Sequence, residues 1–141
     1  MKKLIIGCDP DVDGKGFAIY KDGVLTELKS LSLIKLHQFI EMSEYPIFDI
    51  ELHIEDLHSN KGCWVKGGSG GARSVGRCEQ MQLEVEKVFE DFDIKIVRYP
   101  VSSQWKNASG KKEFERVTGW KGRSNEDTRS AAYFGYLGTI N

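Results

Sequence analysis

The fold is decided by residues 4–10, which read LIIGCDP. Residues 4–6 are apolar without polar alternation, which is typical of a central strand covered on both faces. Asp9 ends this strand, and Pro10 cannot continue a hydrogen-bonded ladder. An Asp at the end of a central strand lies where a sheet opens into a cleft, but Asp-Pro is also a common turn pair. This stretch alone leaves both interpretations open.

The composition indicates an ordinary globular chain. It has 141 residues, 40% of them hydrophobic, with a net charge of -1, which predicts a single domain over residues 1–141 and excludes a disordered chain. No apolar run approaches the ~20 residues of a membrane span. The three cysteines have no metal-type spacing, so we expect free thiols in a reducing cytoplasm.

Hydrophobic periodicity outward from the first strand predicts an α/β fold. Three antiparallel strands open the chain, and helices then alternate with strands. This order predicts a mixed five-stranded sheet, three antiparallel strands then two parallel, flanked by helices. The predicted strands are residues 4–9, 17–20, 24–28, 47–55 and 94–97, and the predicted helices are 32–42, 72–92, 111–118 and a last helix capped by Ser124 or Asn125, with a helical turn at 102–106.

Three acidic positions from distant elements are expected to converge at one edge of this sheet. Asp9 ends the first strand, Glu55 ends a parallel strand beside it, and Glu126 and Asp127 begin the last helix. Carboxylates so close together repel unless a cation holds them, and oxygen ligands suit Mg²⁺ or Mn²⁺. Two such ions could activate water and stabilise the leaving oxygen of a phosphodiester.

Two segments of the neutral chain are locally basic. Residues 61–77 hold four basic residues and no acid, and residues 103–124 hold six basic residues against two glutamates. Such segments indicate a positive patch for nucleic acid, although a solvated charged surface explains either segment alone. Trp64 lies within the first segment, where it could stack on an unpaired base or be a partly buried loop residue.

Four short motifs occur in an order that resembles a known family. They are IGCDP at 6–10 with GFA at 16–18, IEDLH at 54–58, RYP at 98–100 with WK at 105–106 and GKK at 110–112, and NEDTRSAA at 125–132 with YLG at 136–138. Together they make the chain similar to the RuvC-type Holliday-junction resolvases, in particular the small phage-encoded members, within the RNase H-like superfamily.

The resemblance implies a metal-dependent endonuclease that resolves branched DNA, above all four-way junctions, as a homodimer with two Mg²⁺ or Mn²⁺ ions per site. It implies an interface on the helix at 72–92 and a cytoplasmic location in a bacterial cell or a phage-infected host. The implied roles are catalysis by Asp9, Glu55, Asp127 and Lys112 and metal binding by Asp9, Glu55, Asp127 and Glu126. The two basic segments and the aromatic residue among them predict DNA binding by Lys61, Trp64, Lys66, Arg73, Arg77, Lys106 and Lys111.

The sequence departs from the family pattern at two positions. Asp11 follows the Asp-Pro pair where the family usually has Gly, and Ser130 stands where the family often has a second acid three residues after Asp127. Glu126 points about 100° away from Asp127 on a helix. The fourth metal ligand could therefore be Glu126, Asp11 or a water molecule.

Two other function classes remain open from the sequence. A non-catalytic RNase H-like scaffold would bind DNA only, and the presence of Asp9, Glu55 and Asp127 speaks against it. A nucleotide-binding domain of the actin or sugar-kinase type also begins with an Asp and a Gly-rich turn between strands. It would need a second phosphate loop, for which 141 residues leave little room.

Overall fold

Five strands form the sheet: β1 (Leu4–Pro10), β2 (Lys15–Lys21), β3 (Val24–Ser30), β4 (Ile50–Glu55) and β5 (Lys95–Tyr99). The structure is a computed structural model, and it describes residues 2–10, 15–58 and 68–141. The strand order is β3-β2-β1-β4-β5, in which β1, β2 and β3 are antiparallel neighbours and β4 and β5 continue parallel to β1. This confirms the predicted mixed sheet and makes β1 its central strand.

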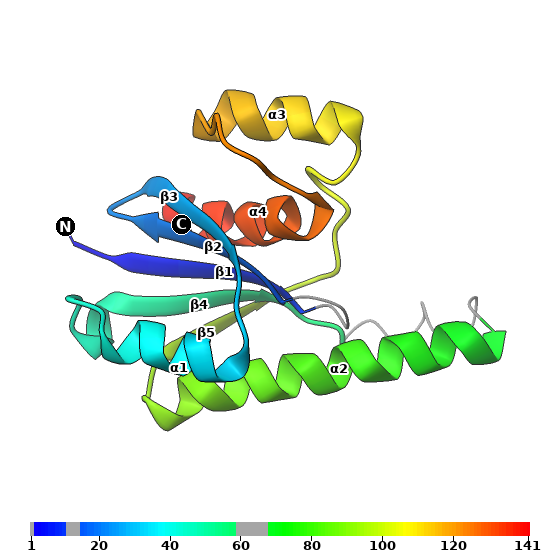
Figure 1. Cartoon of the computed structure of the whole chain (residues 1–141), viewed down its shortest axis with the longest axis horizontal. Coiled ribbons are helices and arrows are strands. Elements are labelled where there is room, and N and C mark those ends of the chain that lie inside the picture. Colours follow the sequence, from blue (N-terminus) through cyan, green and yellow to red (C-terminus); the bar gives the residue numbers. More distant parts are fainter. Residues whose placement is uncertain (1, 11–14, 59–67) are drawn as a thin grey trace.

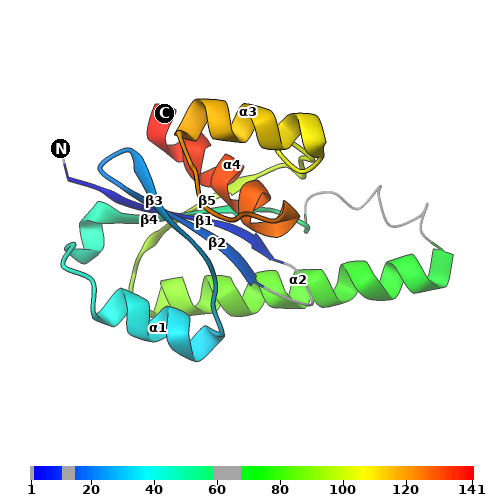
Figure 2. The ribbon, with the colours of Figure 1, turned by 45° about the horizontal axis from the view of Figure 1, so that its top comes forward.

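Helices cover both faces of this sheet: α1 (Leu33–Glu41) and α2 (Gly68–Asp91) lie on one face, and α4 (Glu126–Ile140) lies on the other (Figure 1). Helix α3 (Ala108–Thr118) packs outside α4, away from the sheet (Figure 2). Much of α2 extends past the end of the sheet in both views. The protein therefore has three layers, namely α1 with α2, the sheet, and α4, and α3 forms a partial fourth layer outside α4.

Alternation along β1 assigns its side chains to two cores. Leu4, Ile6 and Cys8 belong to the core beneath α1 and α2, whereas Ile5 belongs to the core beneath α4. Because successive strand residues face opposite sides, Asp9 shares the α4 face with Ile5. Gly7 lies on the same face, where a Cβ would collide with the backbone of α4. β1 and α4 are thus in backbone contact directly beside Asp9.

Several element boundaries differ from those predicted. Residues 47–49 form a short 3₁₀ turn, η1 (Ile47–Asp49), instead of the start of β4. The turn follows Pro46, whose carbonyl accepts a hydrogen bond from the Asp49 amide (2.9 Å). Helix α2 begins four residues before the predicted start, within the Gly-rich segment, whose low helix propensity argued against a helix there. Helix α3 begins earlier because the Asn107 side chain caps it.

Candidate active site

Asp9 is the penultimate residue of β1, which continues through Pro10, and Glu55 is the last residue of the neighbouring parallel strand β4. Cys8 pairs with Ile54, so the next residues on the two strands are Asp9 and Glu55, side by side on the α4 face. Both are only 4% exposed. Buried carboxylates are unfavourable unless charges or hydrogen bonds compensate them, so this pair is a candidate functional site rather than a solvated surface.

Helix α4 brings Asp127 to the same place. Asp9 is the β-sheet partner of Gly16, and a Cβ on Gly16 would lie 2.6 Å from the Asp127 carbonyl oxygen and 3.2 Å from its Cβ. Only a residue without a side chain allows this approach. The helix begins with a capping box between Asn125 and Thr128, which confirms Asn125 as the N-cap. Asp127 therefore lies in the first turn of α4, packed on Gly16, which is the β2 neighbour of Asp9.

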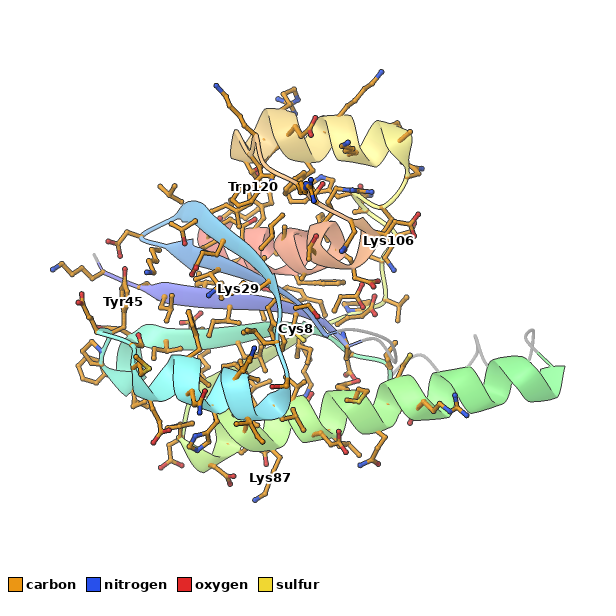
Figure 3. The ribbon with its side chains drawn as sticks, in the orientation of Figure 1. Cys8, Lys29, Tyr45, Lys87, Lys106 and Trp120 are labelled. Carbon is orange, nitrogen blue, oxygen red and sulfur yellow. The ribbon has the colours of Figure 1, made fainter. Side chains whose placement is uncertain are left out.

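Lys106 joins the acids from the loop between β5 and α3. Its Nζ atom lies 3.5 Å from Oδ2 of Asp9. Burial alone would lower the pKa of Lys106, but the negative charges of Asp9, Glu55 and Asp127 outweigh it and leave the pKa raised. Figure 3 shows Lys106 near one end of α4, far from Tyr45 at the opposite end of the molecule. Lys106 thus contacts Asp9 directly and is also stabilised in its charged form by the negative charges of Glu55 and Asp127.

The loop that carries Lys106 is fastened to α4 by Arg129, which is 7% exposed. Its guanidinium donates hydrogen bonds to the carbonyl oxygens of Trp105 (2.8 Å) and Lys106 (2.7 Å) and to Oγ of Ser124 (3.1 Å). Trp105 is held in the left-handed region with φ 68°. Arg129 follows Asp127 by two residues, so one helix positions both an acid and the lysine of the site.

The chain beyond Glu55 is fixed by α2. Gln82, which is fully buried, accepts a hydrogen bond from the Leu57 amide (2.8 Å) and donates one to Oδ1 of Asp56 (3.1 Å). It also donates to Oε2 of Glu86 (2.8 Å), which in turn pairs with Arg98 of β5. This network holds the carboxyl ends of β4 and β5 in place beneath Glu55.

This arrangement of elements is found in solved structures of RuvC. Thermus thermophilus RuvC in complex with a Holliday junction substrate superposes with a TM-score of 0.61 at 11% identity, over 95% of this chain and 90% of that chain. A second Thermus thermophilus RuvC structure gives 0.54 at 16% identity, over 94% and 91%. The chain has the RuvC fold. No protein-family model and no curated protein sequence matches it.

The RuvC fold confirms the RNase H-like sheet architecture that the sequence predicted. The strands of this chain place Asp9 in β1 and Glu55 at the end of β4. At such low identities the shared feature is the path of the backbone. The phage-like subtype and the roles of individual residues stay predictions. Within the described residues, no helix is both long and apolar enough to cross a membrane.

The donor set at the site fits a hard divalent ion in its chemistry. Asp9, Glu55 and Asp127 offer carboxylate oxygens from three separate elements, and all three already act on a single cation, Lys106. Over residues 2–10, 15–58 and 68–141, however, no three His, Cys, Asp or Glu side chains are grouped closely enough to hold an ion together.

The other predicted site residues lie in varied surroundings. Glu126 is exposed in the first turn of α4, whereas Ser130 is 1% exposed and its hydroxyl has no hydrogen-bond partner among the described atoms. Lys111 and Lys112 are exposed on α3, and Arg77 is exposed on α2. Lys61, Trp64, Lys66 and Asp11, together with the side chain of Arg73, fall outside the described residues.

Sequence reasoning gave Arg129 no role, and it assigned Lys106 to DNA binding, with neutralisation of the scissile phosphate as a role that the resemblance implies. One signal could have indicated Arg129: it is the single basic residue in the run TRSAAYFG at 128–135, whose small and apolar residues indicate a buried helix. A buried arginine requires acceptors, and here they are the carbonyl oxygens of Trp105 and Lys106 in the neighbouring loop. The proximity of Lys106 to Asp9 had no comparable signal.

Proposed function

We propose that the protein is a metal-dependent endonuclease that cuts branched DNA, and four-way junctions in particular, by hydrolysis of phosphodiester bonds. The observation that supports this proposal is the buried pair Asp9 and Glu55 at the ends of neighbouring strands of a RuvC-type sheet, with Lys106 3.5 Å from Asp9 and the charges of Glu55 and Asp127 also acting on it. Thermus thermophilus RuvC, whose fold the chain shares, has been captured with a Holliday junction. The phage-like subtype and a cytoplasmic location belong to the same proposal.

The three acids would hold Mg²⁺ or Mn²⁺, and we propose two ions. When bound, such ions lower the pKa of water and stabilise charge on phosphate oxygens. The role of this chain's own residues is to hold the ions by Asp9, Glu55 and Asp127 and to neutralise phosphate by Lys112. Glu126 is kept as a weaker candidate ligand because its exposed position leaves it accessible.

A basic surface on and after α3 supports DNA binding. The exposed basic residues there include Lys111, Lys112, Lys121 and Arg123. Glu113 and Arg116, both on α3, form an ion pair with each other. Lys106 connects this surface with the acid cluster. We propose that phosphates bind along it. The remaining proposed DNA contacts are Lys61, Trp64, Lys66, Arg73 and Arg77.

We propose a homodimer through α2, because two symmetric cuts require two active sites. Helix α2 extends past the sheet (Figures 1 and 2), and Leu83 on it is 48% exposed. Leu83→Glu is expected to yield a monomer in sedimentation experiments while the fold, measured by circular dichroism, is kept. If Leu83→Glu remains a dimer, the interface does not include this position of α2.

The function is tested on a synthetic four-way junction, with a linear duplex of the same sequence as the substrate control. We expect cleavage of the junction only when Mg²⁺ or Mn²⁺ is added. Asp9→Asn, which removes a buried charge without changing the shape, is expected to abolish cleavage but not binding. The matched control is Asp91→Asn, whose carboxylate is exposed and paired with Lys87 on α2; it is expected to cut normally.

A non-catalytic DNA-binding scaffold is the second candidate. It is favoured by one observation, namely that the acids already have a counter-charge in Lys106. Junction binding without cleavage at any concentration of either ion would support the scaffold. Failure to bind the junction at all would refute both candidates.

A further inference from the structure

The acid cluster contains a positive charge that belongs to the chain itself. Asp9 and Glu55 are both 4% exposed, and carboxylates removed from water require nearby cations or hydrogen-bond donors to stay ionised. The ammonium of Lys106 lies 3.5 Å from Asp9 and interacts favourably with Glu55 and Asp127 as well. It therefore supplies the kind of compensation that a bound divalent ion would supply.

The position of Lys106 is built into the backbone and does not depend on a flexible loop. Arg129 binds the carbonyl oxygens of both Trp105 and Lys106 from the buried side of α4. Gly110 packs against the same turn, because a Cβ there would lie 2.6 Å from the Trp105 Cα atom. The main chain on either side of Lys106 is thus held against α4 and α3, and its side chain has only a short path to Asp9.

Lys106 remains accessible enough to leave the cluster. Its side chain is 33% exposed, whereas that of Asp9 is 5% exposed. A lysine has a flexible four-carbon stem, and it can move its charge to another anion while its backbone stays fixed. The acids, in contrast, are fixed on two strands and a helix. An exchange of cations at this site would therefore move the lysine and not the acids.

We propose that Lys106 is a resident cation of the acid cluster, which stabilises the protein without metal and competes with a divalent ion for Asp9, Glu55 and Asp127. This inference rests on the proposed function, because the competing ion is the one proposed there. Like charges at short range repel strongly even in water. Removing the lysine charge is expected to tighten Mn²⁺ binding about tenfold, equivalent to about 1.4 kcal/mol.

The test is Mn²⁺ binding to the DNA-free protein, measured by electron paramagnetic resonance of the free ion. Lys106→Met keeps the length of the side chain and is expected to bind Mn²⁺ about tenfold more tightly, whereas Lys106→Arg keeps the charge and should bind like the parent. The matched control is Lys3→Met. Lys3 has a similar exposure, 36%, and pairs with Glu51 at the opposite end of β4, so it should leave Mn²⁺ binding unchanged.

Thermal unfolding gives a second measurement on the same proteins. Without metal, Lys106→Met is expected to unfold at a lower temperature than the parent, because the acids lose a favourable charge. The same excess of Mn²⁺ should then raise its midpoint by more than it raises that of the parent, since stabilisation by a ligand grows with the logarithm of its concentration divided by Kd. Lys3→Met also loses an ion pair, but Mn²⁺ should raise its midpoint by the same amount as in the parent.

The outcomes separate this inference from the function on which it rests. If the parent binds Mn²⁺ and folded Lys106→Met binds it equally or more weakly, Lys106 is not a competitor and only this inference is overturned. If none of the proteins binds Mn²⁺ at millimolar concentration, the metal centre and the inference both fail. If Lys3→Met binds Mn²⁺ as tightly as Lys106→Met does, the tighter binding results from the lower net charge of the protein. That outcome would overturn the inference as well.

Discussion

Replacement of Arg129 by Met tests whether the buried guanidinium holds the site together. Arg129 makes two hydrogen bonds to main-chain carbonyl oxygens, at 2.8 and 2.7 Å, and a third to Ser124. A hydrogen bond to a charged group contributes about 1.5–3 kcal/mol, and its loss leaves a carbonyl unpaired. Loss of the two carbonyl contacts therefore predicts a decrease of roughly 3–6 kcal/mol in the free energy of unfolding. Arg129→Lys should lose less, because an ammonium can still bond one or two of these oxygens.

Urea denaturation followed by circular dichroism measures this change. Arg116→Met is the control: Arg116 is exposed on α3 and paired with Glu113, an arrangement that contributes little to stability. Mn²⁺ binding should also change in Arg129→Met, because Lys106 is no longer held beside Asp9. A decrease below about 1 kcal/mol, or the same decrease in both variants, would refute the view that Arg129 clamps the loop.

Three further changes test the first turn of α4, the position of Ser130 and the buried His53 of β4. Gly16→Ala should push the first turn of α4 outward, cost about 1–3 kcal/mol in urea denaturation and slow cleavage roughly a hundredfold, whereas an unchanged rate would mean that Asp127 is not held by this contact. Ser130→Asp adds a buried carboxylate one helical turn after Asp127, so the protein should be less stable without Mn²⁺. It should also reach half-maximal cleavage at a lower Mn²⁺ concentration than the parent, and Ser130→Asn is the uncharged control. Burial lowers the pKa of His53, and Glu51 offsets this only in part, so the unfolded chain binds the proton first and stability should fall between about pH 7 and pH 5. In His53→Gln, the free energy of unfolding measured by urea titration should depend less on pH over this range. If it depends on pH as steeply as in the parent, other groups cause the dependence.

The fold could be predicted from local features that agree with one another. The apolar run before Asp9 indicated a central strand, and the Asp22-Gly23 turn indicated the hairpin that follows. Ser32 and Asn125 cap the helices at which they were expected. Such signals depend on a few adjacent residues, so a sequence shows them directly.

The composition of the site depends on contacts between distant segments, and here the sequence was less informative. Lys106 and Lys112 are both lysines in one basic segment, and nothing local indicates which of them reaches the acids. The difference arises because Arg129 draws the turn at Trp105 against α4, 24 residues further along the chain. The start of α2 was placed too late for another reason: a Gly-rich segment has weak helix propensity, so the helix was not expected to reach into it.

The close contact of α4 with β1 and β2 has a consequence for changes in chain length. Because Gly7 and Gly16 bring the helix backbone against the strands, the spacing of the acids is set by main-chain contact and not by side-chain packing. A single-residue insertion in α4 before Ala131 would rotate Asp127 by about 100° away from Asp9. The connection from Gly119 to Asn125, in contrast, lies outside any helix or strand and can lengthen at little entropic cost. Insertions and deletions among proteins built this way should therefore gather in that connection and be excluded from the first half of α4.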